Sequence, residues 1–260
     1  MTTTDAITLS ALAADRVVRH AFFTRQGGVS EGLFASMNCG FGSGDDRGKV
    51  AQNRARAAAR LGVAPERLVT CHQIHGTEVV TVERPWPYEK APRADAMVTI
   101  VPGIALGVLA ADCAPVLFVD PAAKVAGAAH GGWRGALAGV MEATVAAMVQ
   151  LGARAEHVRA GIGPCIAQPS YEVGSEFRDA FIADAPDNAE FFIPAPRAGH
   201  LLFDLPGFIS ARLDRLGLAA VEHTTYDTGA DDALFFSYRR ACRRGESDYG
   251  RALAAIALSA

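Results

Sequence analysis

The sequence lacks a strong excess of charge of either sign. Its 260 residues include 25 lysines and arginines against 28 aspartates and glutamates, so the formal net charge is -3. Nucleic acids and anionic membranes attract proteins with a large positive charge or basic stretches. We therefore expect neither a nucleic acid nor a membrane as a partner. Hydrophobic residues make up 50% and charged residues 20%, which is ordinary for a globular protein with a sizeable core.

The sequence also lacks an uninterrupted apolar segment of membrane-spanning length, which would need about 20 residues. Its longest apolar run, residues 97–119, is broken by Pro102, Asp112 and Pro115. Buried strands joined by a turn explain this run better than a spanning helix. The opening segment MTTTDAITLSALAADRVV has no basic stretch followed by an apolar one, as a signal peptide would have. We predict a cytoplasmic protein.

Cysteines are few, odd in number and widely spread: Cys39, Cys71, Cys113, Cys165 and Cys242. A disulfide framework usually has an even number of closely spaced cysteines in a short secreted chain. This pattern instead indicates a reducing compartment, where thiols serve as core residues, metal ligands or nucleophiles.

No internal repeat, low-complexity tract or proline- and serine-rich linker divides the chain. Patterns typical of buried strands alternate with helical patterns in the middle of the sequence, and hairpins are expected at both ends. This alternation predicts the α/β class, with mixed β-sheets flanked by helices in a single domain over residues 1–260.

The individual elements follow from hydrophobic periodicity and from glycine and proline breaks. Strands are predicted within residues 17–23, 94–100, 104–120, 124–130, 157–166 and 220–228, and helices within 47–62, 136–152, 170–184 and from Pro206 onward. FFSYRR at 235–240 alternates aromatic and polar residues like a half-buried strand. We expect it to pair with a final strand across a polar hairpin tip.

Three residues stand at breaks between apolar runs and glycines. Cys113 separates two apolar runs, His130 precedes two glycines at the end of a predicted strand, and His75 precedes a glycine in the turn QIHG. Strand ends and the turns after them are where α/β proteins expose reactive groups. Two imidazoles and one thiolate form the ligand set of a catalytic zinc site with an open fourth position.

A second interpretation uses the same side chains without a metal. Cys113 would be a thiolate nucleophile and His130 its base. Taken alone, Cys113 is also explained as a small buried hydrophobe. The nearby His72 is another histidine next to a strand end, whereas the other histidines stand in polar stretches or at strand edges.

Several polar residues are candidates for binding substrate or phosphate. Arg134 stands at an expected helix N-terminus, which favours anions. Asp112 would orient an imidazole or cap its own turn, and Arg25 and Asn38 flank a glycine-rich loop. The remaining candidates are Arg54, Gln73 and Asp227.

With these segments assembled, the chain resembles the family once called multicopper polyphenol oxidoreductases or laccase-like proteins of the YfiH type. Its members are now described as purine nucleoside phosphorylases, and some as a peptidoglycan editing factor. The matching segments run nearly end to end: TRQGGVS, MNCG, NRARAAARLG, QIHGTEVV, ADAMVT, LAADCAPVLFVDP, AAHGGWRG, GIGPCI, YEVG and FFSYRR. The combination of QIHG, ADC and HGGWRG is the most specific part.

The resemblance implies a YfiH/CNF-like architecture and a site in which His75, Cys113 and His130 bind Zn²⁺ or Cu²⁺. It implies phosphorolysis of adenosine, inosine and methylthioadenosine with phosphate, together with adenosine deaminase activity, in a monomer or homodimer. The alternatives are a peptidoglycan-precursor hydrolase that uses Cys113 and His130, a copper-dependent polyphenol oxidase, and a non-enzymatic metal-binding or scaffold protein. A multicopper oxidase needs more ligands than this sequence groups together.

The chain departs from the family at one position. Many relatives have a cysteine before FFSYRR, where Asp227 and Thr228 replace a Cys-Thr pair. The role of that cysteine therefore does not transfer, although an aspartate can still hydrogen-bond a substrate.

Overall fold

Two β-sheets packed face to face form the centre of the computed structural model, which describes residues 5–13 and 16–259. The five-stranded sheet has the order β1 (Ala6–Ile7), β2 (Val18–Phe23), β14 (Ala252–Leu258), β6 (Ala105–Ala110), β3 (Leu68–Val69). The six-stranded sheet has the order β13 (Ala220–His223), β9 (Arg159–Ile162), β7 (Ala114–Asp120), β8 (Val125–Gly131), β5 (Ala96–Thr99), β4 (Val79–Thr81). Each sheet contains both parallel and antiparallel pairs.

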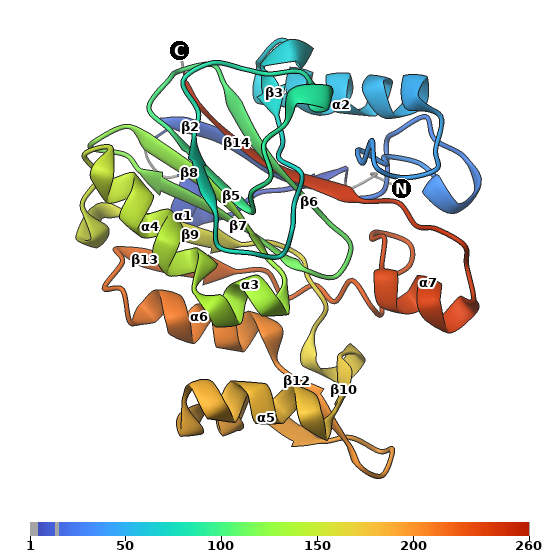
Figure 1. Cartoon of the computed structure of the whole chain (residues 1–260). Coiled ribbons are helices and arrows are strands. Elements are labelled where there is room, and N and C mark those ends of the chain that lie inside the picture. The colour runs from blue at the N-terminus through green and yellow to red at the C-terminus, as the bar shows by residue number, and fades with distance from the viewer. Residues whose placement is uncertain (1–4, 14–15, 260) are drawn as a thin grey trace.

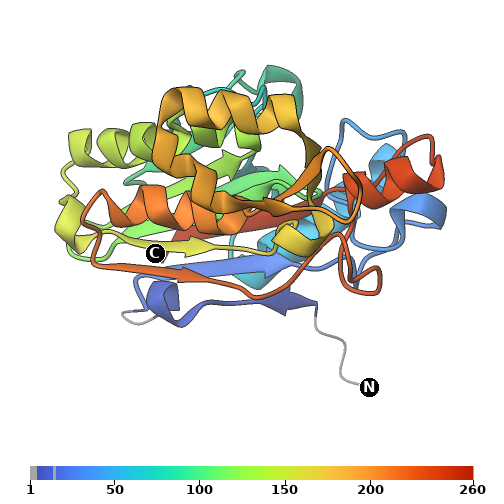
Figure 2. The same cartoon turned by 90° about the horizontal axis from the view of Figure 1, so that it is seen from below.

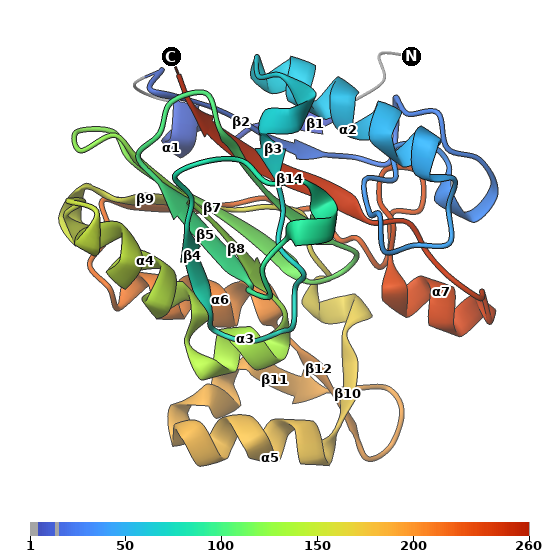
Figure 3. The same ribbon diagram turned by 45° about the horizontal axis from the view of Figure 1, so that its top comes forward.

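Helices lie around this sandwich (Figure 1). They are α1 (Ser10–Ala13), α2 (Arg47–Leu61), α3 (Trp133–Ala138), α4 (Val140–Gln150), α5 (Ser175–Asp184), α6 (Leu205–Asp214) and α7 (Tyr238–Arg244). In Figure 3, α2 lies on one side of the two sheets, and α3, α4 and α6 lie on the other. A small antiparallel sheet accompanies α5: β10 (Glu172–Gly174), β12 (His200–Phe203), β11 (Phe192–Pro194). Figure 2 shows α5 and this sheet nearest the viewer, in front of the main sheets.

Three apolar clusters hold the layers together. Between the two sheets, Phe22 and Ile256 from one pack with Leu117 from the other. Beneath α2, Leu61 packs on the outer face of the five-stranded sheet, and beneath α4 and α6, Phe208 packs on the six-stranded sheet. β7 and β8 are buried along their whole lengths, which explains why their sequences are apolar except for Asp120 and His130.

These layers confirm the α/β class with mixed sheets flanked by helices. The predicted helix over 47–62 is confirmed as α2, which begins after Asp46, whose side chain accepts a hydrogen bond from Lys49 N, and ends at Gly62 in the left-handed region at φ 70°. The strands predicted around residues 17–23, 94–100 and 124–130 are confirmed as β2, β5 and β8.

Four local predictions were wrong in part. The run 104–120 is two strands, β6 and β7, which lie in different sheets and meet at residues 111–113. The helix predicted over 136–152 is broken into α3 and α4, because Gly139 adopts φ 102° between them. The segment 170–184 begins with 3₁₀ turns and strand β10 before α5 starts. The predicted strand at 220–228 is confined to β13.

The segment FFSYRR is not a strand. Ser237 accepts a hydrogen bond from the backbone N–H of Arg240 and so starts α7, which ends at Gly245 at φ 66°. Phe235 and Phe236 are buried just before this helix. The expected C-terminal hairpin is therefore a helix followed by β14.

Candidate metal centre

His75, Cys113 and His130 lie together, as the sequence predicts. One potential ligand atom from each residue lies within 4.8 Å of the other two. The Sγ atom of Cys113 is 3.9 Å from Nε2 of His75, and the rings of His75 and His130 are 4.8 Å apart between centroids. His75 is exposed, Cys113 half-buried and His130 buried, so the cluster opens on one side to the surface.

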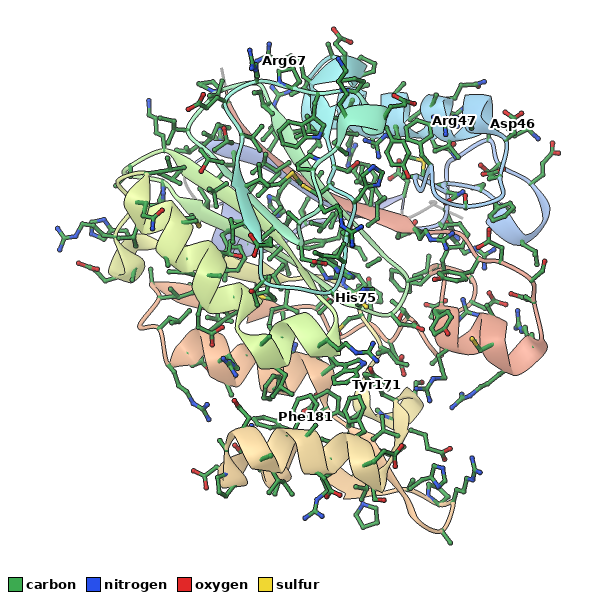
Figure 4. The ribbon with its side chains drawn as sticks, viewed as in Figure 1. Asp46, Arg47, Arg67, His75, Tyr171 and Phe181 are labelled. Carbon is green, nitrogen blue, oxygen red and sulfur yellow. The ribbon has the colours of Figure 1, made fainter. Side chains whose placement is uncertain are left out.

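The strand arrangement explains why these distant residues meet. β7 and β8 are antiparallel neighbours, with Ala114 opposite Gly131 and Pro115 opposite His130. Cys113 immediately precedes β7, so this register sets it beside His130. His75 comes from the loop between β3 and β4, and in Figure 4 it lies at the lower end of the main sheets, above Tyr171.

Asp95, which sequence reasoning missed, connects the two histidines. Its buried carboxylate accepts a hydrogen bond from Nδ1 of His130 at 2.9 Å and from the backbone N–H of His75 at 2.9 Å. It also accepts the backbone N–H groups of Ile74 at 3.0 Å and Gly76 at 2.7 Å. With Nδ1 engaged, Nε2 of His130 is left as its ligand atom. The only sequence signal was one aspartate directly before the apolar strand β5.

The charges of the cluster favour the ligand form of the thiol. Burial by itself would raise the pKa of Cys113, but the charge and hydrogen bonds of His130 and His75 lower it. Burial would lower the pKa of His130, but Cys113 and Asp95 raise it. A thiolate is the form in which cysteine binds metals, whereas His130 binds one only after losing the proton that this pairing favours.

The backbone around the cluster has little room. His75 and Asp112 have φ angles of 58° and 90°, which are uncommon for residues other than glycine. A Cβ atom on Gly132 would lie 2.6 Å from Cδ2 of His75 and 3.2 Å from Sγ of Cys113. The second glycine of HGGW is therefore required for the histidine and the cysteine to keep their places.

The three residues fit zinc or copper. Imidazole and thiolate are the ligands these metals prefer. In a tetrahedral zinc site with two nitrogen ligands and one sulfur ligand, the ligand atoms lie about 3.3 to 3.6 Å apart. The 3.9 Å between Cys113 and His75 is close to that range. Asp95 supplies the carboxylate that commonly orients a metal-binding histidine.

Two cavities share His75, Ala111 and Cys113 in their walls. Cavity A has a volume of about 280 Å³, and its side walls include His72, Gln73, His130, Tyr88, Tyr249 and Arg251. Cavity B has a volume of about 370 Å³, and its walls include Trp133, Arg134, Tyr171, Glu172, Glu176 and Arg239. The cluster of potential ligands thus borders both cavities, with His130 in the wall of cavity A alone.

Three of the other predicted site residues line these cavities. Gln73 in cavity A is bound through its amide to the backbone of Leu109 in β6, at 2.7 and 2.8 Å. Asp112 in cavity B accepts hydrogen bonds from Thr228, Ser237 and the backbone of Arg239, and from neither imidazole. Arg134, also in cavity B, lies over the Trp133 ring at 4.4 Å.

The remaining candidates lie outside cavities A and B. Arg25 is paired with Asp232 at 2.7 Å, and Asn38 is fully buried, with its side chain bonded to Ser43, Asp45 and two backbone amides. Asp227 binds the hydroxyl of Ser170 at 2.6 Å. Arg54 lines a third cavity. Arg25, Asn38 and Asp227 thus have their polar groups engaged by other parts of the fold.

The profile of the family described as multi-copper polyphenol oxidoreductase laccase matches residues 19–259. The chain belongs to this family. The chain is 39% identical to a purine nucleoside phosphorylase of Pseudomonas aeruginosa, over an alignment that covers 88% of this chain and 90% of that one. It is 40% identical to one from Deinococcus radiodurans (88% and 86%) and 42% identical to one from Streptomyces coelicolor (84% and 88%).

Solved structures of similar proteins have the same fold as this laccase-family chain. A DUF152 protein of Neisseria meningitidis is 34% identical, with a TM-score of 0.86 and 98% coverage of both chains. The YfiH protein of Bacillus licheniformis is 28% identical, with a TM-score of 0.89, over 99% of this chain and 98% of its own. Within residues 5–13 and 16–259, no helix has the length and apolar character needed to span a membrane.

Proposed function

We propose that the protein is a metal-dependent purine nucleoside phosphorylase whose metal ion is held by His75, Cys113 and His130. Relatives 39%, 40% and 42% identical over most of both chains are named purine nucleoside phosphorylases. Within the part of the chain that the structure describes, these three residues form the one group of histidine, cysteine or acidic side chains able to hold a metal. One group of three ligands suits a single ion and favours phosphorolysis over multicopper oxidation.

The observation that carries the proposal is that two cavities meet at one cluster of ligands. Phosphorolysis brings two substrates to the same carbon. A phosphate oxygen bonds to C1′ of the ribose while the bond from C1′ to the purine breaks. Separate cavities sharing His75 and Cys113 would let each substrate approach that carbon by its own route.

Arg134 is our choice for the phosphate-binding residue. It is exposed, lines cavity B, and no carboxylate among the described residues pairs with it. Its guanidinium donors therefore remain available for phosphate oxygens, which arginine binds with two parallel hydrogen bonds. Cavity A has the rings of His72, Tyr88 and Tyr249 in its wall, which suit the flat face of a purine.

Zinc or copper bound by the three ligands would act as a Lewis acid beside the reacting bond. Asp95 would keep the imidazole of His130 oriented, because it receives the Nδ1 proton. We further propose adenosine, inosine and methylthioadenosine as substrates, and deamination of adenosine as a second activity. These finer assignments rest on the family resemblance.

The proposal is tested by incubating adenosine with and without phosphate and separating adenine, inosine and hypoxanthine by chromatography. Wild type and Cys113→Ala are compared, with the metal content of both determined. We expect adenine release that needs phosphate, and its loss in the variant together with about one equivalent of metal. No purine product from fully metallated wild type would contradict the proposal and direct attention to peptidoglycan precursors.

The assignment of phosphate to Arg134 has a separate test. Arg134→Gln is expected to raise the KM for phosphate at least tenfold and to change the KM for the nucleoside much less. Arg54→Gln should leave the phosphate KM unchanged, because Arg54 lines neither cavity A nor cavity B. The reverse result would place the phosphate at Arg54.

A further inference from the structure

Arg54 is a buried cation without an anionic partner. It lies on α2 with 8% of its surface exposed. Its guanidinium donates only long hydrogen bonds to neutral oxygens: 3.3 Å to Cys39 O, 3.3 Å to Leu68 O and 3.4 Å to Thr70 Oγ1. No carboxylate within the described residues forms an ion pair with it. Buried charges in proteins are usually paired, because an unpaired one is costly to remove from water.

The guanidinium borders a cavity large enough for a small molecule. This cavity, cavity C, has a volume of about 480 Å³, within the range of common ligand pockets. Its side chains include Phe41, Arg54, Glu66, Thr70, Trp86 and Tyr88. Cavity C therefore combines a buried positive charge with three aromatic rings.

The aromatic rings are held in place by contacts among themselves and with the backbone. The Phe41 and Tyr88 rings are 5.1 Å apart, and the guanidinium of Arg54 lies 5.1 Å from the Phe41 ring. The indole N–H of Trp86 donates to Thr70 O at 3.1 Å. Rings fixed in this way present flat faces at little entropic cost, which suits a planar ligand.

The other charged side chains near cavity C are exposed, so Arg54 is the buried group there that can bind an anion. Glu66 is exposed and forms no ion pair with Arg54. Arg47 lies over the rings of Phe41 and Tyr88 but is exposed and paired with Glu89 at 2.7 Å. Figure 4 labels Arg47 at the outer surface of α2.

Cavity C is distinct from the metal centre. None of His75, Cys113 and His130 lines it, and Tyr88 is the one residue that its wall shares with cavity A. Tyr88 separates the two spaces, with the ring of His72 packed 4.9 Å away on the side of cavity A.

We propose that cavity C is a second ligand site that binds a nucleoside monophosphate, with the phosphate on Arg54 and the base among the aromatic rings. The phosphate would replace the long contacts of Arg54 with short, charge-assisted hydrogen bonds. The base would cover apolar ring surface that inorganic phosphate alone leaves exposed. This assignment does not depend on the proposed phosphorolysis.

The two tryptophans of the chain make the test specific. Trp86 lines cavity C, whereas Trp133 lines cavity B beside the metal centre. In Trp133→Phe protein, Trp86 is the only indole emitter, and in Trp86→Phe protein it is Trp133. Each is titrated with AMP, adenosine and inorganic phosphate while its fluorescence is followed.

We expect AMP to change the emission of Trp86 saturably and to bind at least tenfold more tightly than adenosine or phosphate. Arg54→Gln in the Trp133→Phe background should weaken AMP binding at least tenfold. Arg60→Gln, an exposed arginine on the same helix, is the matched control and should not. Cys113→Ser should bind AMP unchanged, which separates this site from the metal centre.

Three results would overturn the proposal. The first is that AMP leaves the emission of Trp86 unaltered in Trp133→Phe protein. That protein keeps Arg54, so this result does not depend on whether the Arg54 variant folds. The second is that AMP alters the emission of Trp133 alone, which would place AMP at the proposed metal centre. The third is that inorganic phosphate binds as tightly as AMP, which would mean that the aromatic rings of cavity C do not contribute to binding.

Discussion

The carboxylate of Asp95 receives the Nδ1 proton of His130 at 2.9 Å. The same buried carboxylate binds three successive backbone amides, those of residues 74 to 76, so that it places the His75 loop as well. One side chain outside the ligand set therefore organises two of the three ligands. Asp95 does so although it lines neither cavity A nor cavity B.

Asp95→Asn is expected to weaken zinc binding by about 10- to 100-fold, the usual effect of losing a carboxylate partner of a ligating histidine. Zinc affinity is measured by competition with a chromogenic chelator. Asp120→Asn is the matched control, because Asp120 is also buried and also accepts three backbone amides, but it lies at the end of β7 opposite to Cys113 and outside both cavities. Equal zinc affinity in wild type and Asp95→Asn would show that His130 needs no such partner.

Gly132→Ala is expected to lower zinc affinity at least tenfold while leaving the protein folded. The added Cβ would lie 2.6 Å from Cδ2 of His75, so the imidazole must move. Gly44→Ala is the control, since its Cβ would meet only Asp248 Oδ2 at an ordinary 3.5 Å. Metal content and circular dichroism are compared for both variants. Full zinc occupancy in Gly132→Ala would mean that the loop carrying His75 adapts freely.

The ligand cluster could be predicted because its members stand at visible breaks in the apolar pattern. Cys113 interrupts an apolar run, and glycines follow His75 and His130. Asp95 has no such signal, because the sequence does not distinguish an aspartate in an exposed turn before a strand from a buried one. Its role depends on a loop 19 to 21 residues away in sequence, which local pattern cannot reveal.

The fold class was predictable from alternating strand and helix patterns, whereas the division of strands between sheets was not. β6 and β7 form one apolar run, and only residues 111–113 between them send the chain from one sheet to the other. At 235–240, the aromatic alternation suits a strand, but Asp112, 125 residues away from Ser237, binds its hydroxyl. That contact and the cap by Ser237 outweigh the local pattern and start α7.

Asp112→Ala is expected to lower the free energy of unfolding by about 2–4 kcal/mol, because it leaves buried donors without partners. Asp112 accepts from Thr228 at 2.7 Å, Ser237 at 3.0 Å and the backbone N–H of Arg239 at 2.6 Å. Burial raises the pKa of Asp112, and these hydrogen bonds oppose that rise. Urea unfolding measures the loss.

Asp112→Gly separates the two causes of that loss. Asp112 has a φ of 90°, which alanine adopts only with strain and glycine adopts freely. We expect glycine to recover about 1 kcal/mol relative to alanine, with the remainder due to the missing hydrogen bonds. Asp187→Ala, at an exposed aspartate, is the control. Unfolding of Asp112→Ala within 1 kcal/mol of wild type would mean that other groups satisfy Thr228, Ser237 and Arg239.

The stability of the protein is expected to fall with pH because of His20. Burial lowers the pKa of His20 to about 4, although the charge of Glu222 opposes this. Its Nε2 accepts the backbone N–H of Leu9 at 2.9 Å, so the folded state holds the neutral ring. Between about pH 6.5 and pH 4, the unfolded chain binds a proton that the folded chain does not.

That difference amounts to about 3 kcal/mol of stability, present above about pH 6.5 and lost as pH falls to about 4. His20→Gln keeps an acceptor for Leu9 but cannot titrate. The variant should therefore lose less stability than wild type between pH 7 and pH 4.5 in urea unfolding. His223→Gln, at an exposed histidine, is the control and should follow wild type. Parallel pH profiles for wild type and His20→Gln would show that His20 takes up its proton equally in both states.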